Sequence, residues 1–171
     1  ENEQMEQAVV SGIAFNRDEA KISVLGVPDT PGIAYQILGA VADANIEVDV
    51  IIQNLSKDGK TDFSFTVHRN DYSKTIDLLK GQVVPKLGAA DVVGDARICK
   101  VSIVGIGMRS HVGVASKMFR CLAEEGINIQ MISTSEIKTS VVLDEKYMEL
   151  AVRALHRVFD LDKDEEADSI S

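Results

Sequence analysis

Apolar positions in the first half of the chain recur in some segments at the spacing of a helix and in others at every second residue, as in a strand. From Gly32 to Ala44 they recur at the spacing of one buried helix face, and a second helical pattern extends from about Asp71 to Leu87. Around these segments apolar and polar residues alternate, which is typical of half-buried strands. The strands are predicted at 21–27, near 48–52, near 63–67 and, as a closing segment, at 91–95. The predicted order is β-α-β-β-α-β.

The second half repeats this order and then stops one strand short. Its predicted elements are strand 98–105, helix 113–125, strands 127–132 and 138–143, and helix 145–158. The sequence after Phe159 is acidic and polar, whereas 8–15 is an unassigned strand upstream, followed by a predicted turn at 16–19. Because an open sheet edge beside a small core is generally avoided, we expect this N-terminal strand to complete the second sheet.

The two halves are copies of one another. Segment 27–51 aligns with 108–132 without a gap at an offset of 81 residues, which places Gly32 on Gly113, Ala34 on Ala115 and Ile46 on Ile127. The order of elements in each copy is that of the ferredoxin-like unit. The fold is therefore predicted as α+β, with two β-α-β-β-α-β units whose antiparallel sheets carry their helices on one face.

This arrangement predicts that one unit is inserted in the other. The first unit is expected at 16–95, the second at 5–15 plus 96–160, and an acidic tail at 161–171. A single copy is small for a stable core, so two copies in one chain favour a paired architecture with sites where units meet.

Charge and composition narrow the functional class. The net charge of −9 argues against nucleic acid, which favours basic surfaces. No apolar run approaches the roughly 18 residues of a membrane-spanning helix, and the start does not resemble a signal peptide, so a cytoplasmic location is expected. The two cysteines, Cys99 and Cys121, are expected to be buried and reduced, with no metal site and no cofactor.

Candidate chemistry concentrates in the turn between the first strand and first helix. The segment Asp29-Thr30-Pro31-Gly32 places a proline at an expected first helical position and exposes backbone amides, which donate hydrogen bonds to carboxylates. The carboxylate of Asp29 is suited to an ammonium group, and the pair of features matches the needs of a free α-amino acid. The alternative is that Asp29 only caps the helix.

Two longer motifs carry a family resemblance. The segment 27–34 followed by 45–54 resembles the first ACT domain of an aspartate kinase, and 107–115 followed by 126–138 resembles the second. Residues 5–14 resemble the junction after the kinase domain in that family. The resemblance covers residues 5 to 160 and concerns only the regulatory part.

The resemblance implies an allosteric module that binds threonine, and in many members lysine, and that inhibits aspartate phosphorylation. It also implies a homodimer through ACT units, with effectors held at the seam and with a kinase catalytic domain or subunit as partner. Carried over by position, Asp29 would bind the effector ammonium and Gln53 its hydroxyl or amino group. The backbone of Pro31, Gly32, Ile33 and Ala34 would bind the carboxylate, and Asn128 and Ile129 of the facing unit would close the pocket.

The second copy departs from this pattern. Ser110 replaces Asp29 and Thr134 replaces Gln53, so the two pockets are expected to differ in chemistry. Ser135 and Glu136 are candidates for a lysine-binding corner in which Glu136 meets the ammonium. The alternative is a surface glutamate without a ligand.

Catalytic machinery is not evident in the sequence, since no nucleophile and base pair or phosphate-binding loop is recognisable. We expect a regulatory fragment or subunit of an ATP-dependent aspartate kinase. The alternatives are a dimerisation module that binds no amino acid and, less favoured, an acylphosphatase-like enzyme, which would need a partner for Arg109.

Overall fold

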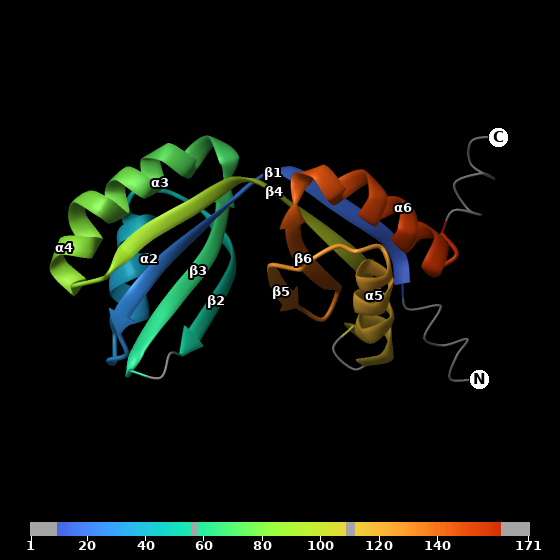
Figure 1. Cartoon of the computed structure of the whole chain (residues 1–171), viewed down its shortest axis with the longest axis horizontal. Coiled ribbons are helices and arrows are strands. Elements are labelled where there is room, and N and C mark those ends of the chain that lie inside the picture. Colours follow the sequence, from blue (N-terminus) through green and yellow to red (C-terminus); the bar gives the residue numbers. More distant parts are fainter. Residues whose placement is uncertain (1–9, 56–57, 109–111, 162–171) are drawn as a thin grey trace. The chain divides into compact units, whose positions relative to one another are not determined.

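The chain forms two compact units in a computed structural model that describes residues 10–55, 58–108 and 112–161 (Figure 1). We call residues 18–98 the central unit, and residues 10–17 with 99–161 the split unit. Most of the predicted acidic tail and the first two residues of the predicted N-terminal strand lie outside the described residues. Each unit is described below by itself.

The central unit has the predicted order of elements. Its hydrogen-bonded strand order is β2-β3-β1-β4, and β3 pairs antiparallel with both β1 and β2. The elements are β1 (Val10–Pro28, from residue 18 on), α2 (Ile33–Asp43), β2 (Val48–Leu55), β3 (Lys60–His68), a 3-10 turn (Arg69–Asp71), α3 (Tyr72–Leu78), a π-helical turn (Leu79–Val83), α4 (Val84–Leu87) and β4 (Asp91–Gly105, up to residue 98).

The split unit repeats this arrangement, with strand order β5-β6-β4-β1. The Ser11 hydroxyl donates to the Val104 carbonyl across 3.2 Å, which ties the first part of β1 to β4. The remaining elements are α5 (Val112–Glu124), β5 (Met131–Thr134), β6 (Lys138–Asp144), a 3-10 turn (Glu145–Tyr147) and α6 (Met148–Val158). The α+β class with two ferredoxin-like units is therefore confirmed.

The predicted turn at 16–19 is wrong, because β1 continues through it as one strand. Its polar side chains indicated a turn, but Glu19 pairs with His68 of β3 and is only 5% exposed. The predicted closing segment 91–95 and the strand 98–105 are likewise one strand, β4. Both long strands contribute residues to both units. The polarity of a short segment such as 16–19 does not indicate this.

The strand predicted at 127–132 is shorter and later than expected, since β5 covers only Met131–Thr134. Ile127 instead follows the end of α5, where its amide donates to the Leu122 carbonyl (2.9 Å) and its side chain is 4% exposed. The left-handed backbone of Gly126 (φ 72°) makes this helix ending possible. The apolar residues in this stretch close the helix end and do not begin the strand.

The helix predicted at 71–87 is continuous but irregular. The π-helical turn at Leu79–Val83 lies just before Pro85, which has no amide to donate to the preceding turn. Leu79 and Val83 are both buried in this turn. The helix therefore keeps its apolar contacts to the sheet while accommodating the proline.

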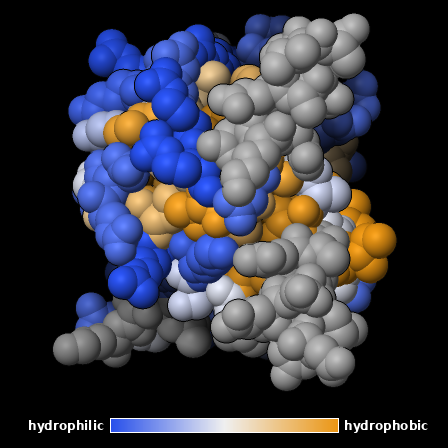
Figure 2. All heavy atoms as spheres, turned by 90° about the vertical axis from the view of Figure 1, so that its right-hand side faces the viewer, coloured by the Kyte–Doolittle hydropathy of each residue, from blue (hydrophilic) through white to orange (hydrophobic). Residues whose placement is uncertain are grey.

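Each unit has its own apolar core between sheet and helices. In the central unit, Phe63 and Phe65 of β3 pack with Ile22 and Val24 of β1 and with α2. In the split unit, apolar residues of β4 and β6 pack with α5 and α6. Figure 2 shows apolar atoms gathered on the side drawn at the right of Figure 1. Half-buried hydrophobic residues of the split unit packed on its core include Phe119, Val158 and Phe159.

Phe65→Ala is expected to lower the free energy of unfolding by about 3–5 kcal/mol, because the side chain is fully buried. Phe15→Ala, also on a strand but 55% exposed, should change it by only about 0.5 kcal/mol. Urea unfolding followed by circular dichroism measures both. Equal losses in the two variants would contradict this assignment of the core.

Candidate functional site

The loop after β1 is tied to the hairpin between β2 and β3. The Asp29 amide donates to the Gly59 carbonyl (3.1 Å), and the Thr30 amide donates to the Pro28 carbonyl (3.0 Å). Residues 28–32 are all exposed. The backbone of this loop is therefore held in place while the Asp29 carboxylate faces solvent.

Helix α2 begins in a way the sequence did not indicate. Its N-cap is Gly32, with the left-handed backbone angle φ of 86°, and no side chain caps the helix. The interpretation of Asp29 as the N-cap is therefore wrong. The prediction that Pro31 is the first helical residue is also wrong, because Pro31 precedes the cap and the helix begins at Ile33. Only glycine adopts this conformation at little cost, which explains why glycine stands at this position.

The backbone amides at this helix start differ in availability. The Ile33 amide donates to the Thr30 carbonyl (3.2 Å), and its side chain is buried in the core. Helix geometry leaves the amides of Gly32, Ala34 and Tyr35 without an intrahelical acceptor. Tyr35 was not singled out from the sequence, although its place in the first turn follows once the cap is known. These amides can donate hydrogen bonds to an anion.

Gln53 lies at the same end of the central unit as Asp29. Strands β1 and β2 both pair antiparallel with β3, so β2 ends where Asp29 leaves β1. Gln53 lies opposite Phe63, whose side chain points into the helix-covered core, so Gln53 shares that face of the sheet. Ile51, two residues earlier, lies on the same face and is 50% exposed. Ile51 was missed from the sequence, where it reads as an ordinary strand residue.

Asn128 and Ile129 lie in the split unit, between α5 and β5. Asn128 is exposed, and Ile129 is half-buried against the core of that unit. They are thus in the other unit from Asp29 and Gln53, and their role in closing a pocket remains a prediction.

Ser135 and Glu136 form the turn between β5 and β6. The Ser135 amide donates to the Lys138 carbonyl (2.8 Å), and the Lys138 amide donates to the Ser135 hydroxyl oxygen (3.3 Å). The Glu136 carbonyl accepts a hydrogen bond from the Met108 amide (2.9 Å). Glu136 itself is exposed. The turn is thus fixed by its backbone, which leaves the Glu136 carboxylate at the surface. Ser110, at the position of Asp29, lies outside the described residues.

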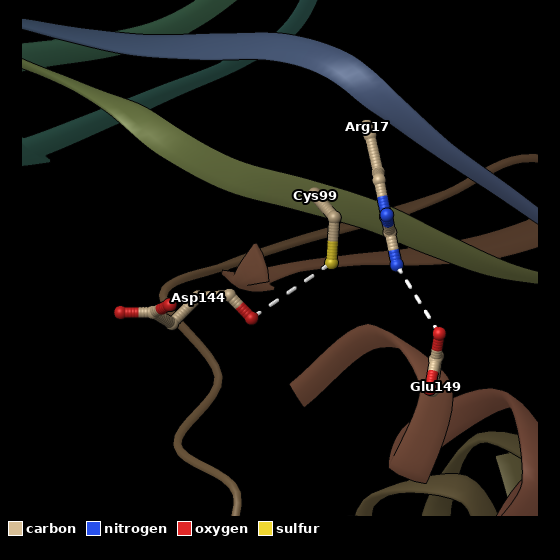
Figure 3. Close-up of polar contacts among 4 residues, drawn as sticks. All are labelled: Arg17, Cys99, Asp144 and Glu149. Carbon is tan, nitrogen blue, oxygen red and sulfur yellow. Dashed lines mark hydrogen bonds and ion pairs between the residues drawn. The ribbon is translucent and has the colours of Figure 1, made fainter. Parts of the chain in front are cut away.

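The described hollows do not coincide with the predicted residues. One of about 340 Å³ lies between α2 and α4, beside Tyr35. A groove of about 770 Å³ lies between β1 and α6, with Phe15, Met148 and Val152 in its wall. Figure 3 shows Arg17 reaching across from β1 to Glu149 of α6, at 3.6 Å between Nη2 and Oε1. Both side chains are more than half exposed, so this ion pair contributes little to stability.

Both cysteines are buried and unpaired with each other. Cys99 lies within 3.9 Å of the Asp144 carbonyl (Figure 3). Burial raises the pKa of the Cys121 thiol, and Glu125 and Glu124 raise it further, against the opposing effect of Arg157. The thiol form is therefore favoured, which makes Cys121 a poor nucleophile. Among the helices of the described segments, none is long and apolar enough to cross a membrane.

Comparison with known proteins gives a consistent result for both units. Models of the ACT domain match residues 22–83 and 101–159. The aspartokinase of Pseudomonas aeruginosa is 64% identical over 162 residues, which cover 95% of this chain and 39% of that protein. The chain thus spans about 39% of the length of the curated relatives it matches.

Solved structures of similar length have the same fold. A chain of aspartokinase alpha and beta subunits is 67% identical, with a TM-score of 0.83, and the match covers 88% of this chain and 99% of that one. The ligand-free regulatory subunit of aspartate kinase from Thermus thermophilus is 38% identical, also with a TM-score of 0.83. That match covers 87% of this chain and 98% of the subunit.

Gly32→Ala should destabilise the chain by about 1–2 kcal/mol, because an L side chain is strained at this left-handed angle. Gly39→Ala, in the same helix, is the control: its new Cβ would meet only the Tyr35 ring at an ordinary 3.8 Å. It should stabilise by about 0.5–1 kcal/mol through helix propensity. Thermal unfolding of both variants measures this, and a tolerated Gly32→Ala would contradict the observed helix start.

Proposed function

Because this chain belongs to the ACT domain family, as the tandem-ACT regulatory part of an aspartokinase, we propose that it binds threonine, and also lysine, between ACT units of two copies. The observation that carries the proposal is the start of α2, where Asp29 is exposed and no side chain caps the helix. A zwitterionic amino acid needs an anion for its ammonium and amide donors for its carboxylate. This turn offers both within a few residues.

The threonine site is built on the central unit. Asp29 binds the ammonium, and the amides of Gly32 and Ala34 bind the carboxylate, with Ile33 and Pro31 shaping the turn. Gln53 reaches the side-chain hydroxyl from β2, and the exposed Ile51 packs against its methyl group. One open side remains, and in the proposed homodimer Asn128 and Ile129 of a facing split unit cover it.

The lysine site is built on the split unit. Its β5–β6 turn holds Glu136 at the surface by hydrogen bonds that do not involve the Glu136 carboxylate, so this carboxylate is offered to an ammonium group. Ser135 supports this turn through Lys138. The two sites therefore differ in chemistry because the two copies of the unit have diverged at the residues that would contact ligand.

Binding at a seam regulates by population shift. A ligand that contacts two units favours the arrangement in which both halves of its pocket are present, by as much as its differential affinity. Such coupling is typically about 1–3 kcal/mol. With an aspartokinase catalytic domain or subunit as partner, the favoured arrangement is the one with low kinase activity, which constitutes feedback inhibition. This function belongs in the cytoplasm, with the biosynthetic enzyme it controls.

Asp29→Asn is expected to remove most of the thermal stabilisation that threonine produces, because the charged hydrogen bond to the ammonium, about 1.5–3 kcal/mol, is lost. Asp43→Asn, at the other end of the same helix, is the control and should respond to threonine as the parent does. Differential scanning fluorimetry with a threonine titration measures both. A fully stabilised Asp29→Asn variant would refute the ammonium assignment.

Glu136→Gln should weaken the calorimetric binding of lysine about tenfold while leaving threonine binding unchanged. Glu125→Gln, also an exposed glutamate of the split unit, is the control. If neither amino acid produces heat with the parent chain, but sedimentation shows a dimer, the chain is a dimerisation module and the effector proposal fails.

A further inference from the structure

The sheet of the split unit has a second hollow, of about 190 Å³, that no part of the proposed effector sites uses. Its wall consists of Ala14, Phe15 and Asn16 of β1, Lys100 and Ser102 of β4, and Lys138 of β6. Val101 and Ile103 belong to the helix-covered core. Because side chains alternate along a strand, Lys100 and Ser102 point to the opposite, helix-free face. The hollow therefore lies on the sheet and not between sheet and helices.

The charged groups that line this hollow are all cations. Two lysines line it, and none of its six residues is acidic. The Ser102 and Ser140 hydroxyls form a hydrogen bond of 2.6 Å, and both residues are 3% exposed. Two hydroxyls have two hydrogens, and their mutual bond uses one, so one hydrogen remains for another acceptor. Ammonium groups with a buried hydroxyl donor are suited to an oxyanion.

The central unit shows that this charge pattern is not a requirement of the fold. Ser23 and Ser64 form the equivalent hydroxyl pair at 2.8 Å, and Lys21 stands where Lys100 does. Asp62 stands where Lys138 does, since each lies two residues before the hairpin serine of its pair, Ser64 or Ser140. The central unit therefore has a built-in carboxylate beside its serine pair, whereas the split unit has a second ammonium.

The backbone around the substituted position has adjusted to the difference. In the central unit the Asp62 carboxylate accepts from the Gly26 amide (2.8 Å). In the split unit the corresponding Gly105 amide donates to the Ile137 carbonyl (2.8 Å) instead. The Gly105 amide therefore does not need a carboxylate side chain as its acceptor. The exchange of Asp for Lys leaves the hairpin satisfied and makes the hollow positive.

We propose that this hollow, between Lys100, Lys138 and the Ser102–Ser140 pair, binds a small oxyanion, phosphate or carboxylate. Its volume exceeds the roughly 30 Å³ share of one water molecule several times, so a single oxyanion with residual water fits. The anion takes the place that the Asp62 carboxylate occupies in the other copy. The site is independent of the Asp29 turn.

The test is an NMR titration of the isotope-labelled 171-residue chain at low ionic strength, with inorganic phosphate in one arm and acetate in the other. Saturable shifts of the Ser102 and Ser140 amides are expected, and the arm with the tighter binding identifies the phosphoryl or the carboxylate source. Lys138→Gln should weaken binding about tenfold, because a charged hydrogen bond is lost.

Lys21→Gln is the control. Lys21 is the counterpart of Lys100 in the central unit and lies beside the other serine pair, so this variant should bind the anion as the parent does. Lys138→Asp, which recreates the charge pattern of the central unit, should abolish binding while its amide spectrum stays dispersed. Asp29→Asn should retain anion binding. Non-saturable shifts in both arms, or an equal loss with Lys21→Gln and Lys138→Gln, would overturn the proposal.

Discussion

The structure depends on the requirement that each small sheet has enough hydrogen-bonded strands to cover its apolar core. The first copy meets this requirement with the contiguous residues 18–98, whereas the described residues after 98 give the second copy only three strands, so the start of β1 provides its fourth. The long strands β1 and β4 supply residues to both units. Each unit thereby reaches the four-stranded order in which both helices can pack on one apolar core.

The two copies of the repeat share several hydrogen bonds but differ in the charged side chains around them. His68 and Asp144, at equivalent strand ends, both accept a hydrogen bond from the amide two residues later. The serine pairs on the central strands are also retained. The charged residues around these conserved features differ between copies. The scaffold thus allows two units with the same order of elements to present different side-chain chemistry.

The helix start at Gly32 shows how backbone geometry prepares a site. Because the cap is a left-handed glycine and not a side chain, the first-turn amides are not already occupied by an internal carboxylate. The neighbouring Asp29 is exposed and does not cap the helix. A capped helix start at the same place would be more stable but less suited to an amino acid, since its donors would be satisfied within the chain.

The sequence by itself determined the fold class, the duplication and the element order, because these follow from hydrophobic periodicity and from the aligned glycines and apolar residues. It also singled out the residues of the α2 turn and the β5–β6 turn. Only the tertiary structure decided that residues 16–19 continue a strand, that Gly32 and not Asp29 caps α2, and that Lys138 faces the Ser102–Ser140 pair. These features depend on pairing between segments far apart in the chain, whose hydrogen bonds and burial override the local preference of polar residues for turns and caps.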